Sequence, residues 1–129
     1  MSFQINFLDH VAIRSTDPQI SADWYQSTLG LQRITHEEWG DYPIMMLSNN
    51  SGIAIFPASK SRKDDRRSVR IDHFAFNVDR EDFEKAQRHF SDLGIKFEFQ
   101  DHHYFHSIYL KDPDGHAVEL TCSVVNDEF

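Results

Sequence analysis

The sequence predicts an α+β fold in which two βαβββ modules follow one another and their strands form a curved mixed sheet shaped like a cup. The first observation is a repeat, since Leu8–Ile13 and Ile71–Phe76 read almost alike and place their histidines 63 residues apart. The same offset, within one residue, relates two further pairs of segments: Leu29–Leu31 with Leu93–Ile95, and Gly52–Ile55 with Gly115–Val118. Self-similarity over nearly the whole chain indicates a duplicated structural unit.

The length is the second observation, because 129 residues suit one domain of ordinary size. We therefore expect a single domain over residues 1–129. Module 1 covers about 5–57, a linker covers 58–69 and module 2 covers about 70–123. The basic residues between Lys60 and Arg70 are interrupted by acidic ones, which is typical of a solvated linker.

In module 1 the first predicted strand is Leu8–Arg14. Asp17-Pro18 then starts a helix, with Asp as cap and Pro in the first turn, and Gly30 ends it. Three strand-like runs follow, separated by turn residues, at Gln32–Glu38, Tyr42–Ser48 and Gly52–Pro57.

Module 2 repeats this order. Strand Arg70–Val78 leads to Asp79 as a helix cap, and Phe83, Ala86, Phe90 and Leu93 follow at helical spacing up to Gly94. The last three predicted strands are Ile95–Gln100, Tyr104–Lys111 and His116–Ser123, with Asp112-Pro113-Asp114-Gly115 as the final turn.

Composition excludes several classes of protein. A net charge of −8 argues against a nucleic-acid partner. The longest apolar runs, such as Ile44–Leu47, are too short to span a bilayer, and no charged-then-apolar leader is evident. The single cysteine, Cys122, suits a reducing compartment, so we expect a cytoplasmic location and no membrane partner.

Strand alternation assigns three polar side chains to one face of the sheets. His10 lies on the face of Ala12, His73 on that of Ala75, and Glu119 on that of Ala117, while the bulky neighbours face the helices. A lone histidine in a strand is more often a satisfied core residue. If the strands curl into one cup, however, two imidazoles and a carboxylate converge as a facial triad that binds a divalent metal and leaves positions open. The sequence therefore predicts a metal site.

These motifs resemble the vicinal oxygen chelate superfamily, which includes glyoxalase I, bleomycin-resistance proteins, fosfomycin-resistance enzymes and type I extradiol dioxygenases. The resemblance runs from Ile5 to Cys122. It implies a small-molecule substrate, a homodimer and a metal held by His10, His73 and Glu119, with Fe(II) or Mn(II) favoured and Zn(II) or Ni(II) also compatible. Its carriers are Leu8-Asp9-His10, Trp24-Tyr25, Leu29-Gly30-Leu31, Ile71-Asp72-His73 and Ser107–Gly115 leading to Glu119.

One departure from the family pattern argues against the members with four protein ligands. Members with four protein ligands place a second carboxylate on the last strand of module 1. Here the repeat aligns Gly52 with Gly115, so that Phe56 takes the place of Glu119. We therefore expect a three-ligand site, with Phe56 and the rim aromatic Trp39 among the substrate-binding residues.

The segment His102–Glu119 resembles the extradiol dioxygenase signature and departs from it at Gln100. The resemblance implies that Tyr109 bonds a catecholate oxygen and that His102 moves protons. Strand alternation places the side chains of Ser107 and Tyr109 on the face inside the cup. Ser107 is therefore a further candidate for substrate binding. Alternation also pairs Tyr109 with His103 rather than His102, unless a bulge intervenes, so both histidines remain catalytic candidates.

Extradiol-type ring cleavage is the leading interpretation. A fosfomycin-type thiol transferase also carries a Ser-x-Tyr like Ser107–Tyr109, but Leu120–Ser123 departs from its pattern. Two further functions stay open, a glyoxalase-like lyase or isomerase and a metal-free binding protein of the bleomycin-resistance type.

Overall fold

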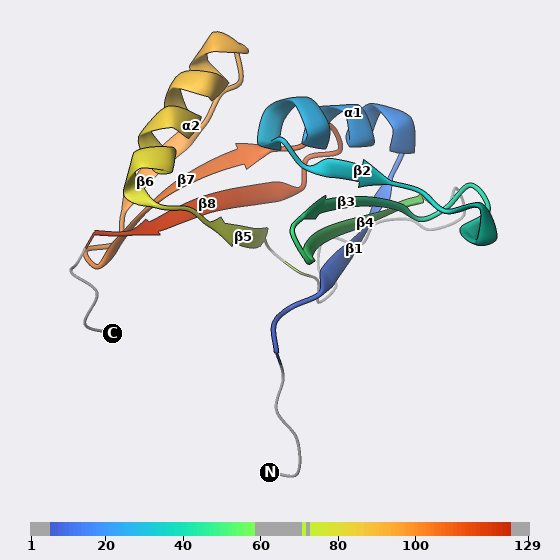
Figure 1. Ribbon diagram of the computed structural model, residues 1–129. Coiled ribbons are helices and arrows are strands. Elements are labelled where there is room, and N and C mark those ends of the chain that lie inside the picture. The colour runs from blue at the N-terminus through green and yellow to red at the C-terminus, as the bar shows by residue number, and fades with distance from the viewer. Residues whose placement is uncertain (1–5, 59–70, 72, 125–129) are drawn as a thin grey trace. The chain divides into compact units, whose positions relative to one another are not determined.

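The computed structural model describes residues 6–58, 71 and 73–124. The chain falls into two compact units, Met1–Arg66 (unit 1) and Arg67–Phe129 (unit 2), and each contains one βαβββ module (Figure 1). The α+β class with tandem modules is thus confirmed. The expected linker lies almost wholly outside the described residues.

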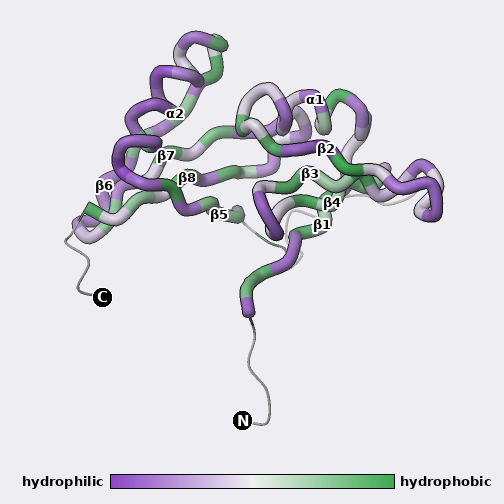
Figure 2. The backbone as a smooth tube through the Cα atoms, in the orientation of Figure 1, coloured by the Kyte–Doolittle hydropathy of each residue, from purple (hydrophilic) through white to green (hydrophobic). Residues whose placement is uncertain are grey.

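Unit 1 is a four-stranded sheet with one main helix. Strand order is β1-β4-β3-β2, in which β1 and β4 run parallel and the other neighbours run antiparallel. The buried core includes Ile13, Ile44, Ile53 and Ile55, and Figure 2 shows hydrophobic colouring along β3 and β4. The elements are β1 His10–Ser15, α1 Pro18–Leu29, β2 Gln32–Ile34, η1 Glu37–Trp39, β3 Ile44–Ser48 and β4 Ser51–Pro57.

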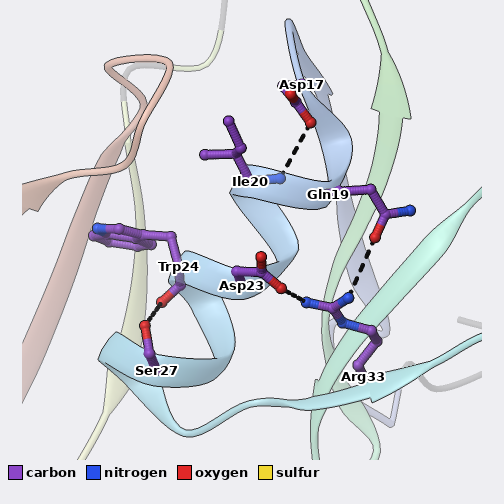
Figure 3. Close-up of polar contacts among 7 residues, drawn as sticks. All are labelled: Asp17, Gln19, Ile20, Asp23, Trp24, Ser27 and Arg33. Atoms are coloured by element: carbon purple, nitrogen blue, oxygen red, sulfur yellow. Dashed lines mark hydrogen bonds and ion pairs between the residues drawn. The ribbon is translucent and has the colours of Figure 1, made fainter.

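Helix α1 begins and ends as its sequence predicts. The carboxylate of Asp17 accepts a 3.2 Å hydrogen bond from the backbone N–H of Ile20, and Gly30 ends the helix in the left-handed conformation. Arg33 on β2 then ties the helix to the sheet, because its guanidinium donates to Asp23 and, at 3.3 Å, to Gln19 (Figure 3). Helix α1 therefore packs on one face of the sheet. The opposite face is formed by side chains of strands β1 and β4.

Unit 2 has the same strand arrangement, in the order β5-β8-β7-β6, with β5 and β8 parallel. Phe83 and Phe90 of its helix are buried, as are Ile108 and Val118 of the sheet. The turn before β8 is closed by the carboxylate of Asp112, which accepts from the N–H groups of Asp114 and His116. The elements are β5 His73–Asn77, α2 Arg80–Asp92, β6 Glu98–Asp101, β7 Phe105–Lys111 and β8 Ala117–Ser123.

One predicted strand is wrong in its second half. The expected strand Gln32–Glu38 ends at Ile34, and Glu37–Trp39 forms a 3₁₀ turn instead. The N–H of Trp39 bonds the His36 carbonyl at 2.9 Å, and that of Gly40 bonds the Glu37 carbonyl, so the chain curls before Gly40. Trp39 consequently lies on a short turn rather than on a strand.

Within the described residues, no helix combines the length and the apolar character needed to cross a lipid bilayer.

Candidate metal centre

The exposed faces of β5 and β1 carry the predicted histidines. Along β5, His73 and Ala75 are exposed while Phe74 and Phe76 are partly buried. Along β1, His10 and Ala12 are exposed while Ile13 is buried. In each unit the histidine therefore lies on the face predicted by strand alternation.

Glu119 is buried on the same face of unit 2, next to His73. Glu119 is only 5% exposed, and its register partner on β5 is Ala75. One carboxylate oxygen, Oε2, accepts a 2.7 Å hydrogen bond from the Ser107 hydroxyl, and Oε1 lies 3.1 Å from Nε2 of His73. Burying a carboxylate is costly unless both oxygens find partners, and these two contacts supply them.

The spacing of these two donor atoms fits a divalent metal. Ligands about 2.1 Å from an ion and at right angles to each other lie about 3.0 Å apart, close to the distance between His73 and Glu119. Imidazole nitrogen with carboxylate oxygen is a donor set typical of Fe, Mn, Zn and Ni. Over residues 6–58, 71 and 73–124, no three acidic, histidine or cysteine side chains gather as a metal site. Unit 2 therefore offers two donors.

His10, the third predicted ligand, belongs to unit 1. Its Nδ1 lies 2.7 Å from Oδ2 of Asp9, the residue directly before it. Metal-binding histidines commonly present one ring nitrogen to the ion while the other donates to a carboxylate. This contact leaves Nε2 of His10 for a ligand. Asp9 is not among the predicted site residues, although an aspartate precedes the histidine in both repeats; Asp72 lies outside the described residues.

Tyr109 and His102 contact each other on the same sheet face as Glu119. Tyr109 is the register partner of Glu119, and its hydroxyl lies 3.1 Å from Nε2 of His102. Burial, and then the negative charge of Glu119, raise the pKa of the Tyr109 phenol, so it stays protonated at neutral pH. The ring of Tyr109 also meets that of His73 edge-on, with centroids 5.9 Å apart.

The expectation that alternation pairs His103 with Tyr109 is wrong, because the strand does not continue through that position. His103 has a positive φ of 71° and lies in the turn between β6 and β7, where it is exposed. The N–H of His102 bonds the Phe105 carbonyl across this turn, so His102 belongs to the β6 side of the hairpin. His102, not His103, is the histidine beside Tyr109.

Ser107 and Phe56, two predicted substrate-binding residues, lie in settings that the sequence did not predict. Ser107 is fully buried, and its hydroxyl donates to Glu119 rather than facing a substrate. Phe56 is not the counterpart of Glu119: Ala12 pairs with Ala54, as Ala75 pairs with Glu119, so Ala54 is the equivalent residue. Unit 1 still has no carboxylate at that place.

The repeat alignment that matched Phe56 with Glu119 was wrong because it equated Gly52 with Gly115, two glycines with different structural functions. Gly115 is a turn residue with φ 85°, whereas Gly52 lies inside β4, where an added Cβ would come 2.0 Å from the Met46 carbonyl oxygen. Phe56 pairs with Arg14 of β1, which lies on the same face of the sheet as His10. The Arg14 guanidinium lies 5.2 Å from the centre of the Phe56 ring. Trp39 is 42% exposed in its turn and lies against His36.

Comparison with known proteins identifies the family. A family model for the glyoxalase/bleomycin resistance protein/dioxygenase superfamily matches residues 7–120. The chain belongs to this superfamily.

The chain is also similar to individual curated and solved proteins. A glutathione transferase FosA from Serratia marcescens is 26% identical over 113 residues, covering 88% of this chain and 78% of that protein. A glyoxalase/dioxygenase structure from Nostoc punctiforme gives a TM-score of 0.76 at 21% identity, covering 93% and 92% of the two chains. A lactoylglutathione lyase from Agrobacterium tumefaciens gives 0.74 at 19% identity, covering 92% and 94%. At these identities the two structures show the shared superfamily fold.

Proposed function

We propose that this superfamily member is a divalent-metal-dependent enzyme that binds a small substrate through two adjacent oxygens, and that its reaction is of the extradiol dioxygenase type. The ligands are His73 and Glu119 of unit 2 with His10 of unit 1. Fe(II) or Mn(II) fits this role best, and Zn(II) and Ni(II) are also compatible with the donor set. When bound, the metal would act as a Lewis acid and as a template for the substrate oxygens.

The contact between His102 and Tyr109 carries the choice of reaction. Its 3.1 Å distance places a phenol hydroxyl within hydrogen-bond reach of an imidazole nitrogen, beside the buried carboxylate of Glu119. The protonated Tyr109 hydroxyl donates a hydrogen bond to a substrate oxygen, and Nε2 of His102 accepts or returns a proton at the Tyr109 hydroxyl. A catechol, with two adjacent hydroxyls to be deprotonated, needs this combination.

The face of unit 1 that carries His10 supports a substrate with an apolar body. Ala12 and Ala54 pair across β1 and β4 on this face, and Met45 of β3 pairs with Ala54. These apolar side chains offer a bound substrate few hydrogen bonds. An aromatic diol therefore fits better than a strongly polar substrate.

A fosfomycin-type thiol transferase is the second candidate, favoured by the 26% identity to FosA. Ser107 and Tyr109 precede the Asp-Pro-Asp-Gly turn and Glu119 as they would in such an enzyme. Glutathione consumption with Mn(II)-loaded protein and fosfomycin tests this candidate directly.

The proposed ligand set draws on both units, which can belong to one chain or to the two chains of a homodimer. Mixing the inactive variants His10→Ala and Glu119→Ala separates these arrangements. If sites form across chains, mixed dimers regain one intact site and bind metal. If each site forms within one chain, every chain keeps its defect and mixing restores nothing.

The reaction is tested by loading the protein with Fe(II) under anaerobic conditions and recording oxygen uptake with a panel of catechols. The proposal predicts uptake with a stoichiometry of about one O₂ per ring cleaved, and a rate of uptake about a hundredfold lower in Tyr109→Phe. Metal binding without uptake on any catechol would remove the dioxygenase assignment. Ligand binding without metal would favour a binding protein of the bleomycin-resistance type.

A further inference from the structure

We propose that the turn between β6 and β7, and His103 in particular, is a positioning element that holds His102 against Tyr109. This inference rests on the proposed function, in which His102 moves a proton at the Tyr109 hydroxyl. We assign His103 no contact with the substrate or with a metal ligand. Its contribution is the conformation of its backbone.

The backbone conformation at His103 is uncommon for a residue other than glycine. Among the described residues, His103 and Asn49 are the non-glycine residues with positive φ, and His103 has a φ of 71°. Residues other than glycine adopt this region at a cost, and such positions cluster at functional sites. The conformation is held by the side chain of Asp101, whose Oδ1 accepts a 2.8 Å hydrogen bond from the His103 N–H.

This conformation closes a two-residue hairpin turn. His102 bonds Phe105 through its N–H, and Asp101 pairs with His106, so that residues 103 and 104 form the tip. Tight hairpins of this kind favour a positive φ at the first central position, where glycine is usual. The turn thereby makes His102 the cross-strand neighbour of Phe105 and places both on the face of Ser107 and Tyr109.

The side chain of His102 is then fixed from two directions. Its ring lies against that of Phe105, with centroids 4.9 Å apart and planes tilted by 33°. Its Nε2 points to the Tyr109 hydroxyl at 3.1 Å. Tyr109 lies seven positions beyond His102 in the sequence, a spacing that would put them on opposite faces of one continuous strand. The turn at His103 therefore accounts for their contact.

Substitutions at the turn test this inference in the full-length protein. His103→Gly and His103→Asn introduce residues that accept a positive φ, whereas His103→Val introduces a β-branched residue that resists it. The first readout is the NMR nuclear Overhauser effect between the His102 and Tyr109 rings, measured without substrate. We expect it to persist in the glycine and asparagine variants and to be lost in the valine variant.

The second readout is turnover at saturating substrate, which should fall about tenfold in His103→Val and stay within about twofold of wild type in His103→Asn. Tyr104→Val, the same replacement at the neighbouring tip position, is the matched control and should keep both readouts. If the valine variant does not fold, Asp101→Ala answers the question, because it removes the acceptor that holds the His103 N–H in the turn. Its ring-to-ring effect should then weaken.

An unchanged ring-to-ring effect in His103→Val would overturn the inference, as would its loss in both His103→Gly and His103→Asn. Failure of the proposed function is a separate result. It would appear as wild-type protein without catechol turnover, while the NMR comparison still reports whether the turn positions His102.

Discussion

The Ser107 hydroxyl donates a 2.7 Å hydrogen bond to Oε2 of Glu119, and this contact leaves Oε1 facing Nε2 of His73. Ser107 is fully buried, so no water competes for its proton. A carboxylate on a single bond can rotate, but one that is held at one oxygen presents the other in a defined direction. The serine thus aims the acidic ligand of the proposed metal site.

Ser107→Ala should weaken metal binding by about ten- to a hundredfold, because partners that orient a ligand contribute this much to affinity. Competition with a chromophoric chelator measures the change. Ser27→Ala, on helix α1, is the control and should bind metal as the wild type does. Equal affinity in Ser107→Ala and the control would mean that Glu119 does not need its serine to bind the ion.

Tyr109→Phe should lower turnover by about a hundredfold while metal content stays the same, since the ring remains and only the hydroxyl is lost. The measurement pairs steady-state kinetics on the proposed catechol substrate with metal analysis of the same sample. A parallel loss of metal would instead assign Tyr109 to the integrity of the site.

The Tyr109 phenol should titrate above its ordinary pKa of 10.0, because burial and the charge of Glu119 favour its neutral form. The folded state then holds this proton to higher pH than the unfolded chain does. Its contribution to stability is complete below about pH 10 and is lost as the pH rises through the folded-state pKa. The difference between ultraviolet titrations of metal-free wild type and Tyr109→Phe measures the phenol, and a midpoint at or below 10 would contradict this environment.

Cys122 should react slowly with a thiol reagent in the folded protein. It is 2% exposed, and burial raises the pKa of its thiol, so both access and thiolate fraction are low. Unfolding in guanidinium should release one reactive thiol per chain, since the sequence contains a single cysteine. Rapid labelling of the native protein would mean that the face of β8 opposite Glu119 is open.

Strand alternation and the repeat were sufficient to predict the α+β class and the faces of His10, His73 and Glu119. Both signals are local, because side chains alternate along any regular strand. The errors arose where the chain departs from regularity. The positive φ at His103 reversed the expected partner of Tyr109, and glycines with different functions shifted the alignment from Ala54 to Phe56. The buried state of Ser107 depends on its neighbours across the sheet, which alternation alone does not report.

Metal binding by wild type and Glu119→Gln tests the central claim most directly. Elemental analysis after anaerobic loading and desalting should find about one divalent ion per chain in the wild type, because each chain supplies one complete ligand set. Glu119→Gln should retain less than about a tenth of an equivalent. The matched control is Glu98→Gln, the same change at an exposed residue. Glu98 and Glu119 are the register partners of Tyr109 on its two neighbouring strands. The Glu98→Gln variant should bind like the wild type. A wild type that holds less than about a tenth of an equivalent, or a Glu119→Gln variant that binds as well as Glu98→Gln, would contradict the metal site.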